Sequence, residues 1–153
     1  MDRGLIVAQT ARRGPYNDCA TLRPLVDAAH RRVPIALVLA DAECDSARNH
    51  QHVRHRLHAQ SVIPAKRGGA DWRIQGVRAQ MRQDFPAHLY RRRALIESLI
   101  SAVKRKLSAR VPGRSLQTQC LQALLLGIPY NIYRLWLFAL RGYTPDEESL
   151  HRS

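Results

Sequence analysis

The chain has 153 residues, of which 45% are hydrophobic, so it is long enough and apolar enough to fold around a core of its own. It is strongly basic, with 25 lysines and arginines against 12 acidic residues and a formal net charge of +13. This composition excludes an intrinsically disordered chain and favours a polyanionic partner, above all nucleic acid. An arginine-rich composition imposed by a GC-rich genome is the alternative explanation of the charge.

Three further features bear on where the chain works. Its three cysteines are widely spaced, which fits neither a disulfide framework nor a zinc site and favours a reducing cytoplasm. Residues 1–14 are too polar for a secretory signal. The apolar segment 122–140 contains Asn131 and Arg134, so we do not interpret it as a membrane span.

The first half of the chain alternates strand-like and helix-like patterns. An apolar segment precedes a turn that ends at Asp18, a residue suited to cap the next helix. A continuous apolar run after a proline is typical of a strand covered on both faces. The predicted elements are a strand at 4–10, a helix after residue 18, a buried strand within 34–42, a polar helix at 44–60 and a short strand at 61–65.

The second half is mainly helical. A basic loop at 66–73 is followed by an ambiguous region, 74–88, which we interpret as a helix broken before Pro86. Helices are then predicted at 90–107 and 115–140, the second kinked at Pro129. The order of elements predicts an α/β fold in one domain, residues 1–141, followed by a flexible tail, residues 142–153.

One carboxylate stands where ligands commonly bind. Asp41 follows the predicted buried strand, and in open α/β sheets the crevice outside the carboxyl ends of strands is the usual site. Asp45 and Ser46 are better placed to cap the next helix, which leaves Asp41 available for a ligand. The alternative is that Asp41 only ends the strand.

A second carboxylate lies within a basic helix. At about 100° per residue, Tyr90, Arg93, Glu97 and Lys104 share a stripe about 60° wide that borders the apolar face. Cations one and two turns away keep Glu97 ionised and able to accept a metal ion. The alternative is a surface ion pair between Arg93 and Glu97, which would stabilise the helix only slightly. Four histidines at 50–58 spread around their helix too widely to form a tetrahedral zinc site.

The spacing Tyr90-x2-Arg93-x3-Glu97-x6-Lys104 resembles the signature around the last carboxylate of the DDE transposases of bacterial insertion sequences. "VLADAECDS" (38–46) resembles the segment around the second carboxylate of that family. Three other segments resemble family segments in the same order, and the resemblance covers roughly residues 4–140: "RGPYND" (13–18), "VIPAKRG" (62–68) and "YNIYRL" (130–135).

The resemblance implies a ribonuclease-H-like fold, a mixed sheet flanked by helices, in which carboxylates at one end hold Mg²⁺, with Mn²⁺ as a substitute. Asp41 matches the second acidic ligand and Glu97 the third. Hard cations prefer such oxygen ligands. The implied contacts to DNA phosphate are Tyr90, Arg93 and Lys104, and the basic loop adds Lys66 and Arg67 as candidates.

The chain departs from the family pattern at three positions. Cys44 stands where the family usually has tyrosine, and Glu43 where a small residue is common. The family's first aspartate lies on a strand upstream of the segment that matches 4–18, and neither Asp2, Asp18 nor Asp27 fits that position. We therefore expect an N-terminally truncated domain with weak or absent catalysis.

The predicted function is DNA transposition, by Mg²⁺-dependent cleavage and strand transfer of phosphodiester bonds, in a truncated or inactive fragment that lacks the first metal-binding aspartate. Whether the chain is itself an enzyme stays open. A non-catalytic DNA-binding regulator derived from a transposase is the first alternative, and a basic structural or ribosome-associated protein is the second. The implied partners are transposon ends and target DNA, together with a second copy or a full-length transposase. No membrane partner is expected, and the expected location is the cytoplasm, on the nucleoid.

Overall fold

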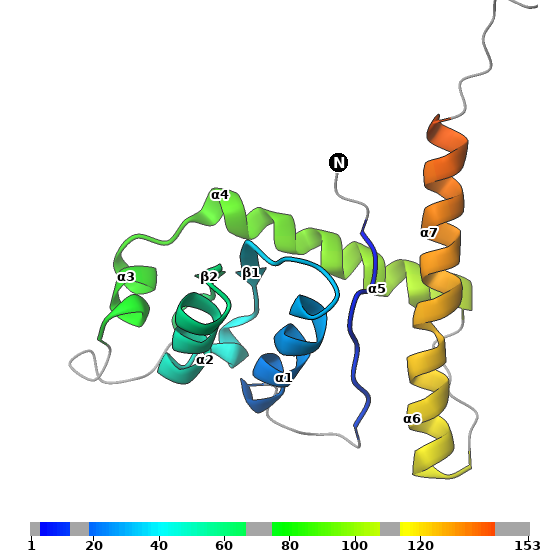
Figure 1. Ribbon diagram of the computed structural model, residues 1–153, viewed down its shortest axis with the longest axis horizontal. Coiled ribbons are helices and arrows are strands. Elements are labelled where there is room, and N and C mark those ends of the chain that lie inside the picture. The colour runs from blue at the N-terminus through cyan, green and yellow to red at the C-terminus, as the bar shows by residue number, and fades with distance from the viewer. Residues whose placement is uncertain (1–3, 13–18, 67–74, 108–113, 143–153) are drawn as a thin grey trace, which may run out of the picture.

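The computed structural model describes residues 4–12, 19–66, 75–107 and 114–142 (Figure 1). The helices and strands confirm an α/β chain. They are α1 (Cys19–His30), β1 (Leu37–Leu39), α2 (Ala47–Gln51), β2 (Gln60–Val62), α3 (Val77–Gln83), α4 (Ala87–Tyr90), α5 (Ala94–Leu107), α6 (Leu116–Leu125) and α7 (Gly127–Gly142). Figure 1 shows a body made of α1, α2, α3 and the strands under the long α4–α5 helix, with α6 and α7 stacked as a column to one side.

The sheet is smaller than the expected mixed sheet. In the described part of the chain it has two parallel strands, β1 and β2, with Leu37 opposite Gln60 and Leu39 opposite Val62. The central strand predicted within 34–42 is therefore present as β1, and the strand predicted at 61–65 is present as the shorter β2. The ribonuclease-H-like arrangement stays a prediction.

The core lies where α1 and the segment after α2 cover the sheet. Val38 of β1 and Val26 of α1 are both buried, together with Val53, Leu57 and Ala59. Val26 belongs to the apolar stripe that the 3.6-residue period predicts for α1. Because apolar burial contributes roughly 25 cal/mol per Å², this cluster stabilises the packing of α1 on the sheet.

The helix predicted at 44–60 is interrupted. An α-helix covers only Ala47–Gln51, and a π-helical turn, η2 (His52–Arg56), follows it. The wider turn closes with a bond of 3.3 Å from Leu57 N–H to the carbonyl of His52. His58 then adopts φ 51°, a left-handed conformation that ends the helix before β2.

Residues 4–12 do not form the predicted strand. Instead the side-chain amide of Asn131 in α7 takes the place of a neighbouring strand. It accepts a bond of 2.8 Å from Ile6 N–H and donates one of 2.8 Å to the Ile6 carbonyl. The apolar pattern of this segment is strand-like, but its partner for backbone bonds is a helix side chain.

The long helix predicted at 115–140 is interrupted at one residue, Leu126, between α6 and α7 and about one turn before Pro129. Pro129 has no N–H, so it cannot bond to the carbonyl of Leu125 one turn earlier. The side chain of Gln9 donates to the neighbouring carbonyl of Leu124 and so ties segment 4–12 to this break. A Cβ at Gly127 would lie 2.6 Å from the side-chain amide of Gln9, so this side chain would have to shift if residue 127 were larger.

The α6–α7 column spans Leu116–Leu140, 25 residues, and by length and composition alone it is apolar enough to cross a membrane. Such a helix is weak evidence by itself, since core helices of soluble proteins have the same composition. Two polar side chains of this column face segment 4–12 in the described structure. They are Asn131, bonded to Ile6, and Arg134, whose guanidinium lies against Gly4.

Some sequence-based predictions lie outside the described residues. These are the cap at Asp18, the basic loop beyond Lys66 and the tail at 143–153.

We expect replacement of Asn131 by alanine to destabilise the protein by about 1–3 kcal/mol, because both backbone groups of Ile6 lose their partner. Urea denaturation followed by circular dichroism measures the change. Gln117→Ala, an exposed amide on α6, serves as the control and should shift stability by less than about 0.5 kcal/mol. Equal effects of the two substitutions would contradict a structural role for the Asn131 amide.

Candidate functional site

Asp41 lies directly beyond the carboxyl end of β1, as the sequence predicts. Its Oδ1 accepts a bond of 2.6 Å from Ala42 N–H and caps the one-turn helix η1 (Ala42–Cys44). Ser46 caps α2 through a bond of 3.1 Å from Asn49 N–H. The prediction that Asp41 is free of capping is therefore wrong for one of its two oxygens, while the capping role of Ser46 is confirmed. The side chain of Asp41 is 58% exposed.

Arg93 joins the two carboxylates that the sequence singles out. Its Nη2 donates to Oδ2 of Asp41 at 2.9 Å, and its Nη1 donates to Oε1 of Glu97 at 2.8 Å. Arg93 lies in η4 (Arg91–Arg93), the turn between α4 and α5, and Glu97 lies one turn further along. The end of a strand and the start of a long helix are thereby brought to one guanidinium, although the two carboxylates are far apart in the sequence.

The bond from Arg93 to Glu97 is the i,i+4 ion pair that the sequence offers as the alternative to a ligand. Glu97 is 66% exposed, so this ion pair adds no more than about 1 kcal/mol to the stability of the protein. The second bond, from Arg93 to Asp41, joins two different elements and therefore could not be predicted from helix geometry alone. One flat guanidinium can serve two carboxylates because its donors point outward in a fixed fork.

The ring of Tyr90 packs against the guanidinium of Arg93. The guanidinium carbon of Arg93 lies 5.8 Å from the Tyr90 ring centre, and the ring packs edge-on against Phe85 at 5.1 Å. Burial raises the pKa of the Tyr90 phenol, and the Asp41 and Glu97 carboxylates add to that rise against the opposing charge of Arg93. The phenol therefore stays protonated at neutral pH and can donate a hydrogen bond.

The remaining predicted DNA contacts are only partly placed. Lys66 is exposed and pairs through Nζ with Oε2 of Glu43 at 3.0 Å. Arg67 lies outside the described residues, and Lys104 is placed only by its backbone, seven residues after Glu97 in α5. Arg91 and Arg92, which the signature does not include, are exposed beside Arg93.

Sequence reasoning missed the role of Asp45. Its side chain is fully buried and receives two bonds from Arg78, at 2.8 Å from Nε and 2.7 Å from Nη2. The backbone N–H of Lys66 adds a third bond, at 3.0 Å. Burial alone raises the pKa of this carboxyl, but the bonds from Arg78 and Lys66 outweigh burial and lower it below the ordinary value. Asp45 therefore fixes the loop that carries Asp41.

A buried histidine completes this support. His50 is 1% exposed, and its Nδ1 lies 2.8 Å from Oγ of Ser61, which also receives a bond of 3.0 Å from Arg54 Nε. Its Nε2 is 3.6 Å from Asp45, too far for a hydrogen bond. Burial lowers the pKa of His50, so the imidazole is neutral at neutral pH. The histidines are thus dispersed, since His52 bonds to Asp27 in α1 at 2.7 Å.

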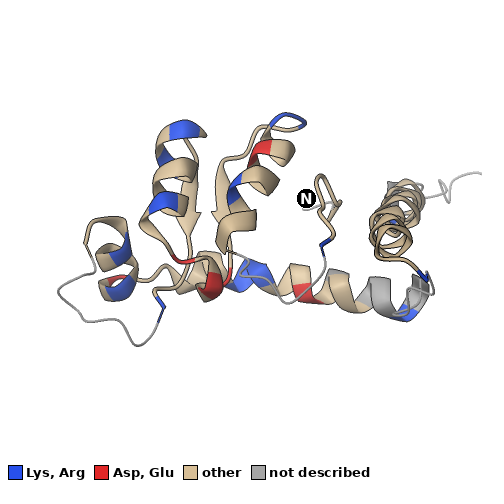
Figure 2. Cartoon of the chain, turned by 90° about the horizontal axis from the view of Figure 1, so that it is seen from below, with Lys and Arg blue, Asp and Glu red and all other residues tan. Residues whose placement is uncertain are grey.

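Acidic and basic positions meet where the strand ends reach the α4–α5 helix (Figure 2). No group of three His, Cys, Asp or Glu side chains able to hold a metal ion occurs among the described residues. The site has two carboxylates held by one guanidinium, so a cationic group already lies between them. A divalent ion fits this donor set, since hard cations prefer carboxylate oxygens, but it must compete with Arg93.

Comparison with known proteins identifies the family of this chain. Residues 2–132 match the family described as transposase DDE domain. This chain belongs to that family. No curated protein and no solved structure matches it. The transposase family acts on DNA and generally uses divalent metal, and membership links this chain to DNA transposition. The sequence-based recognition is confirmed at the level of the family, and its specific branch stays a prediction.

We expect the stability of the protein to fall as the pH is lowered from 7.5 to 5.5. His50 stays neutral in the folded state because burial lowers its pKa, while in the unfolded state it takes up a proton near pH 6.5. Protons therefore favour unfolding as the pH falls below the unfolded pKa. Urea denaturation at several pH values measures the slope.

His50→Gln should flatten this pH dependence, whereas His55→Gln, an exposed histidine in the same turn, should leave it unchanged. A full pH dependence retained in His50→Gln would show that other groups cause it.

Proposed function

We propose that this chain binds DNA and a divalent cation at the place where Asp41 and Glu97 meet, and that this is the site of transposase-type phosphodiester chemistry. The observation that carries the proposal is the pair of hydrogen bonds from Arg93, which brings the strand-end carboxylate and the helix carboxylate to one point. Membership of the transposase DDE domain family supports a role for these two carboxylates in binding a catalytic metal ion. Mg²⁺ is the proposed ion, with Mn²⁺ as a substitute.

Each residue has a distinct proposed role. Asp41 offers Oδ2, since its Oδ1 is held by Ala42 N–H, and Glu97 offers its carboxylate from the first turn of α5. When bound there, a divalent cation supplies positive charge that polarises a phosphodiester and stabilises the oxygen that leaves. Tyr90 orients Arg93 by packing against it.

The cations around the site are suited to hold DNA. Arg91 and Arg92 are exposed next to Arg93, and Lys66 stands beyond Glu43. Contacts of this kind with phosphate position nucleic acid without reading its sequence. Transposon ends and target DNA are the proposed substrates. Lys104 and Arg67 are proposed as further contacts on the strength of the family signature and the basic loop.

Arg93 has to give up its carboxylates before a divalent ion can bind them. An approaching phosphate competes for the guanidinium and so frees both carboxylates at the moment when DNA is present. We therefore propose that the metal and the DNA bind cooperatively, with Arg93 moving from carboxylate to phosphate. The two described carboxylates support one loosely held ion, and we propose that cleavage by this chain alone is weak or absent.

The same observation favours a second candidate function, a non-catalytic DNA-binding regulator derived from a transposase. A permanent bond between Arg93 and both carboxylates would keep them from binding a metal ion and leave the neighbouring cations, Arg91 and Arg92, as a DNA-binding surface. In that role the chain pairs with a second copy or with a full-length transposase on the nucleoid, in the cytoplasm.

The metal site is tested by thermal unfolding of the whole chain with increasing Mn²⁺ or Mg²⁺. We expect saturation to raise the unfolding temperature by a few degrees, since an ion at 100 times its dissociation constant adds about 2.7 kcal/mol. Asp41→Asn should weaken the apparent affinity about tenfold or more, and Arg93→Gln should strengthen it by removing the competing cation. Glu43→Gln, which changes a neighbouring carboxylate bonded to Lys66, is the control.

Metal affinity that is the same in the wild type and in Asp41→Asn would refute the site. Metal-dependent nicking of supercoiled DNA, lost in Glu97→Gln, would instead show that the chain is catalytically complete and that our expectation of weak cleavage is wrong.

DNA binding is tested by titration of a labelled duplex at several salt concentrations. We expect the double variant Arg91→Ala/Arg92→Ala to weaken binding about tenfold and to reduce the slope of log K against log salt by about 0.9 for each phosphate that the protein no longer neutralises. The control is Arg31→Ala/Arg32→Ala, which removes the same charge at the other end of β1, after α1. An equal weakening of binding in both variants would mean that charge alone, and not this site, binds DNA.

A further inference from the structure

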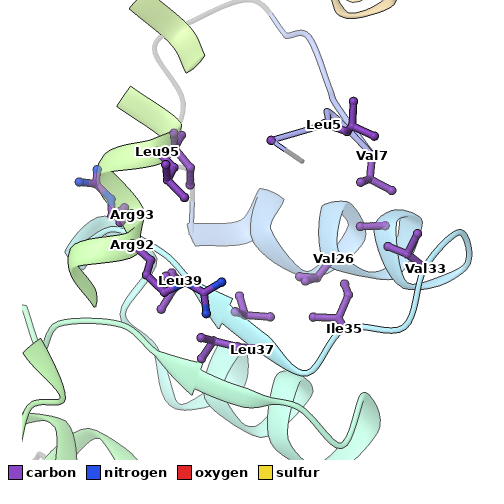
Figure 3. A pocket seen from close by; sticks show the side chains of 14 residues that line it. Leu5, Val7, Val26, Val33, Ile35, Leu37, Leu39, Arg92, Arg93 and Leu95 are labelled. Carbon is purple, nitrogen blue, oxygen red and sulfur yellow. The ribbon is translucent and has the colours of Figure 1, made fainter. Parts of the chain in front are cut away.

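The first residue of α1 is a cysteine on the face of the helix that packs against the sheet. Cys19, Leu22 and Val26 lie at positions i, i+3 and i+7, so they share one face of α1. Leu22 and Val26 pack into the core cluster, and Val26 lines one groove with the side chains of β1 (Figure 3). This arrangement directs Cys19 toward the segment that follows β1.

One buried amide joins Cys19 to a second cysteine, Cys44, the last residue of η1. The side chain is that of Asn49, which is 1% exposed. Its Nδ2 donates to the carbonyl of Cys19 at 2.9 Å and to the carbonyl of Cys44 at 2.8 Å, and it also lies 3.4 Å from Sγ of Cys19. A primary amide has two N–H donors, so both serve to hold the two cysteine backbones next to each other.

The two thiols differ in their access to solvent. Cys19 is half-buried, whereas Cys44 is only 9% exposed, so a dissolved oxidant reaches Cys19 first. A cation lies near Cys19 as well. The bonds to Asp45 raise the pKa of the Arg78 guanidinium, burial opposes them, and the negative charge of a Cys19 thiolate adds to the rise. The thiolate is the reactive form of a thiol, and this one has a guanidinium close to it.

Cys19 and Cys44 lie far apart in the sequence, and only the fold brings them together. The third cysteine, Cys120, lies in α6, in the column to one side of the body (Figure 1). In a reducing cytoplasm the disulfides that do form are usually transient and serve to sense oxidants. An accessible cysteine that reacts first and a neighbouring cysteine that resolves the product are the parts of such a sensor.

We propose that Cys19 and Cys44 form a reversible disulfide when the chain meets hydrogen peroxide. The Cys19 thiolate attacks one peroxide oxygen, the O–O bond breaks, and the sulfenic acid of Cys19 forms with release of hydroxide. The Cys44 thiolate then attacks the sulfur of Cys19, the S–S bond forms, and a second hydroxide leaves. The two hydroxides take up the protons of the two thiols, so the products are one disulfide and two molecules of water.

The disulfide fastens the first turn of α1 to η1, the turn between Asp41 and Asp45. A disulfide requires Cα atoms about 4.4–6.8 Å apart. The shared amide of Asn49 limits how far apart the two backbones can lie, and η1, a single turn, can adjust by the remainder. Formation of this bond needs neither a metal ion nor DNA, so the proposal is independent of the proposed function.

The test uses the whole chain with Cys120→Ala, so that Cys19 and Cys44 are the remaining thiols. Hydrogen peroxide is added to the folded, reduced protein, unreacted thiols are blocked, and the protein is digested with trypsin for mass spectrometry. We expect the peptides 14–31 and 33–48 to be joined by a disulfide that forms at a rate independent of protein concentration. A dithiol reductant should separate the two peptides and restore both thiols.

Cys44→Ala in the same background should lose the joined peptides and leave oxidation confined to Cys19. If that variant fails to fold, the parent chain in concentrated urea provides the second measurement. There the disulfide should form at least tenfold more slowly, because the contact through Asn49 is lost. Oxidation of Cys19 to its sulfinic acid while Cys44 stays a free thiol would overturn the proposal. A disulfide that forms equally fast in urea, or only between two molecules, would overturn it as well.

Discussion

The structure depends on one guanidinium that holds two carboxylates from different elements. Asp41 and Glu97 carry like charges, and without a cation between them they would repel each other. Arg93 removes that repulsion and fixes the distance between strand and helix with two charge-assisted bonds. Both carboxylates are more than half exposed, so the pair contributes little to stability. The two bonds instead determine where the two carboxylates lie relative to each other.

The loop that carries Asp41 is held in place by a buried ion pair next to the site. Asp45, four residues after Asp41, is buried with its charge matched by Arg78 and its second oxygen bonded to the backbone of Lys66. A buried ion pair of this kind is costly to break, because the remaining charge would be left buried without its partner. The exposed carboxylates can therefore exchange partners while the loop that carries Asp41 stays in place.

The sequence predicts the chemistry of this site better than its geometry. The buried strand before Asp41 follows from its continuous apolar run and is present as β1, and the helix that carries Glu97 is present as α5. The bond from Arg93 to Asp41 cannot be read from periodicity, because it joins residues that only the tertiary fold brings together. An Asp-Ser pair is a common helix start and so predicts capping by Asp45, yet burial and Arg78 make this residue an anchor.

Two errors in the secondary structure have different origins. The apolar segment 4–10 has the composition of a strand, but a strand exists only where another backbone bonds to it, and here the side chain of Asn131 bonds to Ile6 instead. That contact is distant in sequence, so the local pattern could not reveal it. The polar helix after Ser46 ends in a π-turn, and its buried residues Val53 and Leu57 lie four apart, a spacing that an ordinary α-helix also provides, so the sequence pattern does not distinguish the two.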